Sequence, residues 1–159
     1  MVIKSWLVIG VVTFAVAFLL SAANQRSDIQ WFSRLRRPQW LTFERLIPLI
    51  WITIFICGAW SAVILWERDP GTSSTWLLMG LYLLLEVVTM AYTPVMCKLQ
   101  SLRVGVVIGA TGTVLSLMLG LTVVQFSTPA GLLLLPYILW SPIGTYTTWV
   151  MSCLNPNQA

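Results

Sequence analysis

The sequence predicts an all-α membrane protein, a single domain over residues 1–159 that is a bundle of five transmembrane helices. Two observations predict it. Hydrophobic residues make up 58% of the chain and charged residues only 9%, and the apolar residues gather in five long stretches. A membrane-spanning helix needs about 20 predominantly apolar residues. The alternating pattern of a barrel is missing, and a helix satisfies its own backbone in lipid, so helices are expected despite internal Gly and Pro.

The expected spans follow one another with short connections. They are 6–23, 46–66, 76–97, 104–126 and 132–153. The first has an alternative, because Lys4 precedes an apolar run that ends in Ser21, Ala22 and Ala23, a small-residue cluster typical of signal-peptide cleavage. The run is as long as a span, so a retained helix is the simpler interpretation.

The basic residues predict the orientation. Five arginines lie in the first loop and Lys98 and Arg103 in the third connection, whereas the opposite side carries only Lys4 and Arg68. Basic residues in short loops favour the cytoplasmic face. We therefore expect the N-terminus outside and the C-terminus, with the first loop, in the cytoplasm. The net charge of +4 suits contact with anionic lipid better than nucleic acid.

The composition excludes most familiar catalytic sites. The chain has no histidine, so a His-ligated haem and a His general base are unavailable. Its three cysteines lack the close spacing of a metal or redox motif. We therefore expect no metal site, no required cofactor and no catalytic residues.

One acidic residue, Glu86, lies near the middle of the third span. An ionised carboxyl is costly there, so the side chain should face the bundle interior, pair with another group or stay protonated. Helical spacing places Tyr82, Thr89 and Thr93 on the same stripe. The stripe either lines a cavity or fixes the packing by interhelical hydrogen bonds, and the residues alone do not decide.

Nine tryptophans are an unusually large number for a chain of 159 residues. Those at span ends are typical of interfacial belts. Trp51, Trp60 and Trp140 lie several residues inside their spans, where an indole should face other helices or a bound ligand rather than lipid. A flat aromatic or sterol-like ligand would suit such walls, so packing and pocket roles are both open.

The most specific patterns lie in the first loop and at the starts of two spans. The loop reads WFSRLRRPQW at 31–40, the second span begins with IPLIW at 47–51, and the last contains LLPYILW at 134–140 before Leu154-Asn155. In this order, over essentially the whole chain, the motifs resemble those of the tryptophan-rich sensory protein and translocator protein (TspO/MBR) family, formerly called the peripheral benzodiazepine receptor.

The chain resembles a divergent member of that family. Tyr92 stands where the third helix of the family has a Trp, and Thr89 where it has an Asn. In the fifth helix the usual Leu-Asn pair is Thr147-Thr148. These departures bear on which ligand is preferred.

The resemblance implies a membrane receptor or regulator that binds porphyrins (tetrapyrroles) and other hydrophobic ligands in a cavity of the bundle, capped by the first loop, and tunes their level, transport or breakdown under stress. The tetrapyrrole, including haem, would be a ligand rather than a cofactor. Carried over by position, and with Glu86 added, the candidate ligand-binding residues are Trp40, Pro48, Trp51, Phe55, Glu86, Tyr92, Trp140 and Gly144. Arg36, Arg37 and Arg45 are candidates for pairing with propionates, although positive-inside charge explains them as well.

Two other classes of function stay open. Some bacterial members of the family promote light- and oxygen-dependent porphyrin degradation, which implies a possible enzyme with tryptophans against the macrocycle. A small-molecule transporter is the other, with Glu86 as a proton-coupling group.

Partners and location follow from three further features. Gly105 and Gly109 have the small-xxx-small spacing that lets helices approach, and Gly112 extends this surface. Because the family is commonly dimeric, we expect a homodimer there, with packing inside one bundle as the alternative.

No Lys or Arg follows Arg103, so the last span lacks the sterol motif of animal members and cholesterol binding should be poor. We therefore expect a bacterial membrane, the mitochondrial outer membrane being the alternative.

Overall fold

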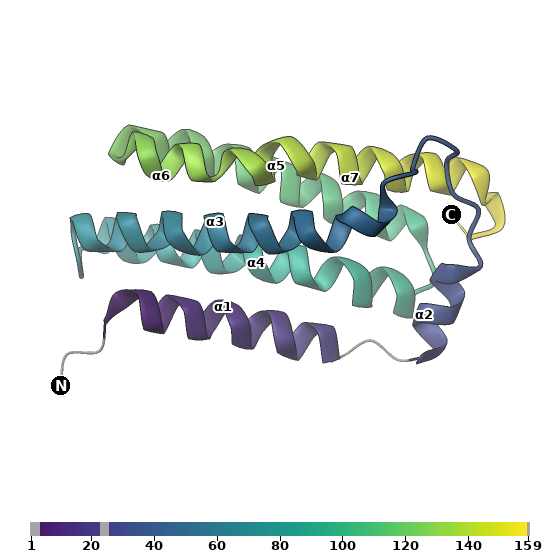
Figure 1. The fold of residues 1–159 in the computed structure, drawn as a ribbon, viewed down its shortest axis with the longest axis horizontal. Coiled ribbons are helices and arrows are strands. Elements are labelled where there is room, and N and C mark those ends of the chain that lie inside the picture. Colours follow the sequence, from purple (N-terminus) through teal and green to yellow (C-terminus); the bar gives the residue numbers. More distant parts are fainter. Residues whose placement is uncertain (1–3, 23–25, 159) are drawn as a thin grey trace.

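Every regular element in residues 4–22 and 26–158, the part of the chain that this computed structural model describes, is a helix. The long helices lie side by side along one axis (Figure 1). They are α1 (Ser5–Ala22), α2 (Arg26–Ser33), α3 (Ile47–Arg68), α4 (Ser73–Lys98), α5 (Leu102–Phe126), α6 (Thr128–Leu133) and α7 (Leu135–Leu154), with short 3₁₀ helices at Glu44–Leu46 and Pro156–Gln158. The predicted all-α bundle is confirmed.

Four helices, α1, α3, α4 and α5, are long and apolar enough to cross a membrane. The predicted fifth span corresponds to α6 followed by α7, which lie nearly in line (Figure 1). The sequence predicted one helix over 132–153, but the structure starts four residues earlier and interrupts the helix at Leu134. Ser127 starts α6 by accepting a hydrogen bond from the Ala130 N–H, and Pro136, which lacks an N–H, lies in the first turn of α7. The predicted end of the first span, at Ala23, lies outside the described residues.

Tight turns connect α3 to α4 and α4 to α5. Gly71 takes a positive φ of 81° before α4, a conformation that glycine adopts without a steric penalty. The side chain of Thr72 then caps α4 by accepting from the Thr75 N–H, and Ser101 caps α5 by accepting from the Val104 N–H. Such short connections make helices that are neighbours in the sequence antiparallel.

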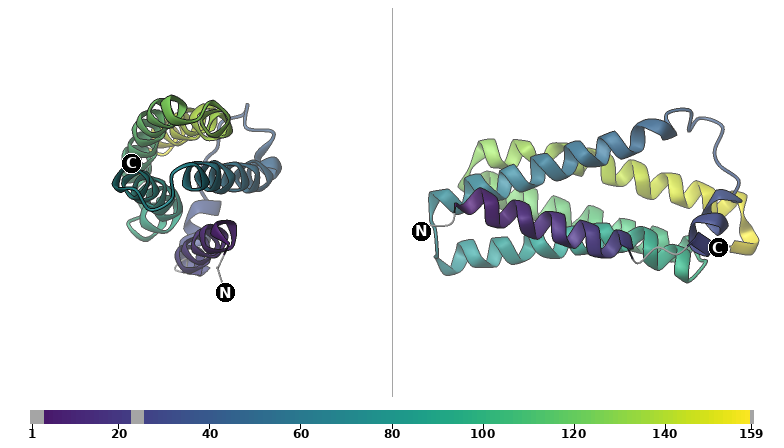
Figure 2. Two further views of the ribbon diagram at one scale, coloured as in Figure 1. Left: turned by 90° about the vertical axis from the view of Figure 1, so that its left-hand side faces the viewer. Right: turned by 60° about the horizontal axis from the view of Figure 1, so that its bottom comes forward.

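The spans α3, α4, α5 and α6–α7 share a buried core, and α1 lies outside it. Helix α5 packs between α4 and α7, α3 packs against α4, α6 and α7, and α1 packs mainly against α3 and α4 (Figure 2). The end-on view shows α1 at the edge of the bundle. None of the described residues of α1 is buried. This helix is therefore a side wall rather than part of the core.

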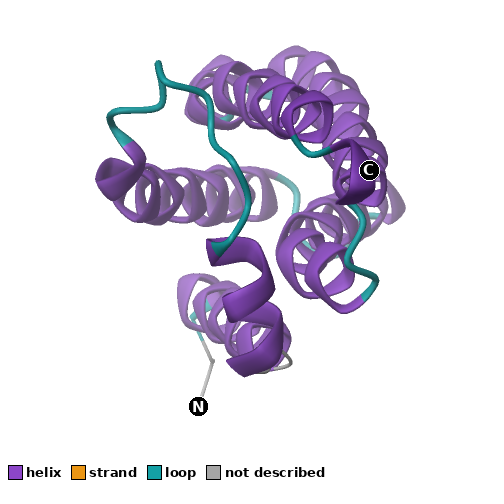
Figure 3. Ribbon diagram, turned by 90° about the vertical axis from the view of Figure 1, so that its right-hand side faces the viewer, coloured by secondary structure: helices purple, strands orange, loops and turns teal. Residues whose placement is uncertain are grey.

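The first loop crosses one end of the bundle and is fastened to the C-terminal segment (Figure 3). Trp31 Nε1 donates to Gln158 Oε1 at 2.8 Å, and the Arg36 N–H donates to Asn155 Oδ1 at 2.9 Å. Leu35 of this loop is buried against the ends of α4, α5 and α7 in a cluster with Met96, Cys97, Leu102 and Met151. The loop thus closes the end of the bundle at which α4 finishes.

The glycines of α5 face inward. A Cβ added to Gly109 would lie 2.6 Å from Thr145 Oγ1 of α7, and one added to Gly105 would lie 2.4 Å from Met96 Sδ of α4. One added to Gly112 would lie 3.0 Å from the Tyr137 hydroxyl oxygen. The small-residue surface is therefore used for packing within one chain, which is the alternative that the sequence left open.

Candidate functional site

A cavity of about 550 Å³ lies between α1, α3, α4 and the α6–α7 span, in the half of the bundle away from the first loop. The cavity exists because several of its lining residues have small side chains or none. These residues are Gly58, Ala59 and Ala62 on α3 and Gly80 on α4. A Cβ added to Gly58 or Gly80 would meet no atom within 4 Å. The volume lies in the range of pockets that enclose drug-sized ligands, and most of the wall is aliphatic or aromatic.

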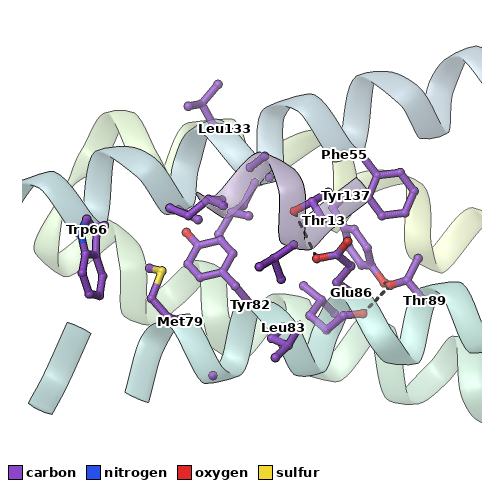
Figure 4. A pocket seen from close by; sticks show the side chains of 18 of the residues that line it. Thr13, Phe55, Trp66, Met79, Tyr82, Leu83, Glu86, Thr89, Leu133 and Tyr137 are labelled. Atoms are coloured by element: carbon purple, nitrogen blue, oxygen red, sulfur yellow. Dashed lines mark hydrogen bonds between the residues drawn. The ribbon is translucent and has the colours of Figure 1, made fainter. Parts of the chain in front are cut away.

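Polar side chains of α4 line one wall (Figure 4). The Thr89 hydroxyl donates its proton to the Leu85 carbonyl. In the hydrogen bond between Thr89 and Tyr137, the Tyr137 hydroxyl must therefore be the donor. By the same reasoning Tyr82 donates to Ser61, whose own proton goes to the Ala130 carbonyl. The predicted stripe therefore has both roles, since Tyr82, Glu86 and Thr89 line the cavity and also bond across helices.

Glu86 lies within this wall and points toward α1 (Figure 4). Its Oε2 accepts a hydrogen bond from the Thr13 hydroxyl of α1 at 3.3 Å, which is long for an O–H donor. Its Oε1 is buried and has no hydrogen-bond partner among the described residues. No Lys or Arg belongs to the described residues that line the cavity. The cavity thus contains an acceptor that the protein leaves unsatisfied.

Of the residues predicted to bind ligand, Phe55 and Glu86 line the cavity. Trp51 lies just behind its wall, in ring contact with Phe55 at 6.0 Å and edge-on to Tyr137 at 6.1 Å. Trp51 therefore supports two aromatic wall residues from outside. Pro48 is exposed in the first turn of α3.

The other predicted ligand-binding residues lie nearer the first loop. Trp40 of the loop stacks on Tyr146 at 6.2 Å, and Phe43 meets Trp140 edge-on at 6.2 Å. Tyr92 bonds the Thr148 hydroxyl across α4 and α7. A Cβ added to Gly144 would meet no atom within 4 Å, so some space remains there. In this half of the bundle the aromatic side chains contact one another rather than line the cavity.

The three arginines proposed for propionates are not at the cavity. Arg37 pairs with Glu44 at 2.7 Å and lies 5.5 Å from the Phe32 ring centroid. Arg36 and Arg45 are exposed. Glu86 precedes the end of α4 by 12 residues, or roughly 18 Å at about 1.5 Å per residue, and the first loop packs at that end.

Trp60 contradicts the expectation that an indole inside a span faces protein or ligand. Its side chain is 62% exposed. It shares the outer face of α3 with Ile52 and Ile56, eight and four residues earlier, and both are exposed as well. The position of a residue along a span indicates its depth in the membrane but not the face of the helix on which it lies. That face determines whether the side chain contacts other helices or lipid.

Sequence reasoning missed the contribution of α1 and of two tryptophans. Val8, Val12 and Thr13 of α1 line the cavity, yet apart from Thr13 nothing in that run distinguishes the wall from lipid-facing positions. Trp66 and Trp76, assigned to an interfacial belt, also line it and meet edge-on at 4.9 Å. The sequence did place Trp66 and Trp76 on either side of a short connection between two spans, and this was the available signal that they could meet.

Comparison with known proteins agrees with this architecture. The sequence model of the TspO/MBR family matches residues 8–154. The chain is 26% identical over 153 residues to the "Uncharacterized membrane protein YtaB" of Bacillus subtilis (strain 168), which covers 94% of this chain and 95% of that protein. It is also 26% identical over 153 residues to the "Tryptophan-rich protein TspO" of Bacillus cereus, covering 96% and 97%. This chain is a membrane protein that belongs to the TspO/MBR family.

Proposed function

We propose that this protein is a membrane receptor or regulator that binds tetrapyrroles and other hydrophobic ligands in the cavity beside Glu86, and that it tunes their level, transport or breakdown under stress. The observation that carries the proposal is the cavity of about 550 Å³ with an apolar and aromatic wall and a few convergent polar groups. Ligand sites in helix bundles have this composition. Family membership supports it, because a tryptophan-rich homologue matches nearly the full length.

The bilayer is part of the proposed route. Because α1 forms a side wall with no buried residue, a ligand dissolved in lipid reaches the cavity by passing along this helix. We place the first loop and the C-terminus on the cytoplasmic side, as the arginine-rich loop favours, in a bacterial membrane.

Glycine substitutions test the cavity directly. In Gly58→Leu and Gly80→Leu the new side chain enters the cavity from a position where a Cβ meets no atom within 4 Å, so each variant should fold and fill the space. Gly10→Leu is the matched control, because Gly10 has the same free surroundings on α1 but does not line the cavity. Protoporphyrin is titrated into the protein in nanodiscs and followed by quenching of tryptophan fluorescence.

The expected result is saturable quenching that weakens at least tenfold in both cavity variants and is unchanged in Gly10→Leu. Gly144→Leu, Trp40→Phe and Trp140→Phe locate the alternative site under the first loop. If these three weaken binding while Gly58→Leu and Gly80→Leu leave it unchanged, the ligand binds under the loop and the proposed site is wrong. No saturable quenching at micromolar protoporphyrin would contradict tetrapyrrole binding itself.

A light-dependent activity is the second candidate, and the observation that favours it is the pair Trp66 and Trp76 at the cavity wall. In this reading the two indoles contact a bound porphyrin that is degraded with molecular oxygen as the oxidant. Illumination of the saturated complex in air should then bleach the porphyrin absorbance faster than illumination of free porphyrin in empty nanodiscs. Trp66→Phe and Trp76→Phe should slow bleaching while preserving binding, and equal rates with and without protein would exclude the activity.

A further inference from the structure

We infer that Glu86 is the specificity-determining group of the cavity, and that it selects apolar ligands that present an N–H donor, either a protonated amine or the pyrrole N–H of a free-base tetrapyrrole. The inference rests on the proposed binding function of this cavity and narrows its ligand class.

The unsatisfied oxygen is the first reason. A buried polar atom without a partner is rare in proteins, and each one calls for an explanation. Glu86 Oε1 is such an atom, at the wall of a cavity large enough for a ligand. The carboxyl group turns easily about its last side-chain torsion, so a donor within the cavity meets Oε1 or Oε2 after a small rotation.

The weakness of the existing contact is the second reason. The Thr13 hydroxyl donates to Glu86 Oε2 over a long distance of 3.3 Å. Thr13 belongs to α1, which lies at the edge of the bundle and has no buried residue among those described. An N–H donor on a ligand makes a shorter, charge-assisted bond to a carboxylate and can take the place of the threonine hydroxyl. The neighbouring hydroxyls do not compete for Oε1, because Tyr82 and Tyr137 already donate to Ser61 and Thr89.

The charge of the wall is the third reason. A carboxyl inside a bilayer stays protonated unless a counter-charge or a strong donor stabilises its ionised form, and the described lining residues supply no Lys or Arg. A ligand that carries a positive charge or a strong N–H donor supplies what the wall lacks. A ligand carboxylate placed there would repel Glu86, so the acidic groups of a porphyrin must point away from it.

Matched probes test the inference. 1-Pyrenemethylamine and 1-(methoxymethyl)pyrene share an aromatic body, but only the amine carries a hydrogen-bond donor, and energy transfer from tryptophan to pyrene reports binding in nanodiscs of zwitterionic lipid. Protoporphyrin dimethyl ester and its nickel chelate form the second pair, since the chelate has lost the pyrrole N–H groups. Both pairs are measured on the wild-type protein, on Glu86→Gln, on Thr13→Val and on the cavity-filled Gly58→Leu variant.

We expect the wild-type protein to bind the donor-bearing member of at least one pair tenfold or more tightly than its partner. The pair that shows the preference identifies the source of the donor as amine or pyrrole. Glu86→Gln should reduce the ratio to within threefold by weakening the donor-bearing probe while binding its partner normally, which also shows that the variant is folded. Thr13→Val should keep or increase the preference.

Two results would overturn the inference. One is equal affinity within both pairs for the wild-type protein. The other is a preference that survives in Glu86→Gln. If all probes bind and Gly58→Leu weakens none of them, the cavity is not the binding site, and the proposed function at this site fails together with the inference. Tight binding to the cavity without any preference leaves the proposed function intact and removes only the role of Glu86.

Discussion

The side-chain amide of Asn155 bonds both backbone polar groups of Arg36, a residue 119 positions earlier in the chain. The Arg36 N–H donates to Asn155 Oδ1 at 2.9 Å, and Asn155 Nδ2 donates to the Arg36 carbonyl at 3.0 Å. Nδ2 also donates to the Met151 carbonyl at 2.8 Å, which orients the amide on the last turn of α7. One side chain therefore holds the first loop against the end of the fifth span.

Asn155→Ala should release the first loop, because both hydrogen bonds to the Arg36 backbone are lost together. The exposed arginines Arg34 and Arg36 should then be cut by trypsin at least several-fold faster in the folded protein. Asn155→Asp is the control. It keeps the acceptor for the Arg36 N–H but loses the donor, so its cleavage rate should lie between those of the wild-type protein and Asn155→Ala. Equal cleavage in all three proteins would show that other contacts hold the loop.

Tyr92 and Thr148 should be energetically coupled across α4 and α7. The Thr148 hydroxyl donates to the Gly144 carbonyl, so it accepts from the Tyr92 hydroxyl. Tyr92→Phe and Thr148→Val should each lower stability by about 0.5–1.5 kcal/mol, a usual range for interhelical hydrogen bonds in membranes. The double variant should cost less than the sum, as measured by unfolding in mixed micelles. Strict additivity would mean that the two hydroxyls contribute independently.

Two glycines should respond oppositely to the same substitution. A Cβ at Gly131 would lie 3.0 Å from the Val124 Cα, and backbone cannot move aside as a flexible side chain can. Gly131→Ala should therefore destabilise the protein by about 1–3 kcal/mol, the usual cost of overpacking. Gly58→Ala has free space and should be neutral or stabilising by up to about 1 kcal/mol, from better helix propensity. Thermal unfolding in detergent compares them, and equal midpoints would contradict the packing at Gly131.

Ser61→Ala should weaken the junction of α3, α4 and α6. The Ser61 hydroxyl is fully buried and bonds both the Ala130 carbonyl and the Tyr82 hydroxyl. Its removal leaves Tyr82 without its acceptor, at a cost of about 1–3 kcal/mol for an unsatisfied buried group. Adding Tyr82→Phe should recover part of this loss, because the orphaned hydroxyl is then gone. A double variant less stable than Ser61→Ala would show that the Tyr82 hydroxyl is not left unsatisfied in Ser61→Ala.

The helical spans could be predicted from the sequence because their signal is summed over many residues. Four of them agree with the structure to within a few residues at each described end, the predicted end of the first span lying outside the described residues. The interruption at Leu134 arises from the local chemistry of Ser127 and Pro136. The loop motifs also predicted the family correctly.

The cavity could be predicted only in part. Glu86 was identifiable because a carboxyl in mid-span is costly wherever it points. The positions of Gly58, Gly80 and the α1 residues depend on how far apart the helices pack, which no single helix encodes. The resemblance stated from the sequence motifs marked Tyr92 and Thr148 as departures from the expected pattern, but only the structure shows that the two residues are bonded to each other.

The edge position of α1 has a consequence for how the protein assembles during its synthesis. This helix precedes α3 and α4 in the chain, yet these are the spans on which it packs. It therefore enters the bilayer before its partners exist and remains there as an independent helix until both have been inserted. The cavity is complete only later still, because the α6–α7 span, which supplies Leu133, Leu134 and Tyr137 to its wall, is the last of the spans in the chain.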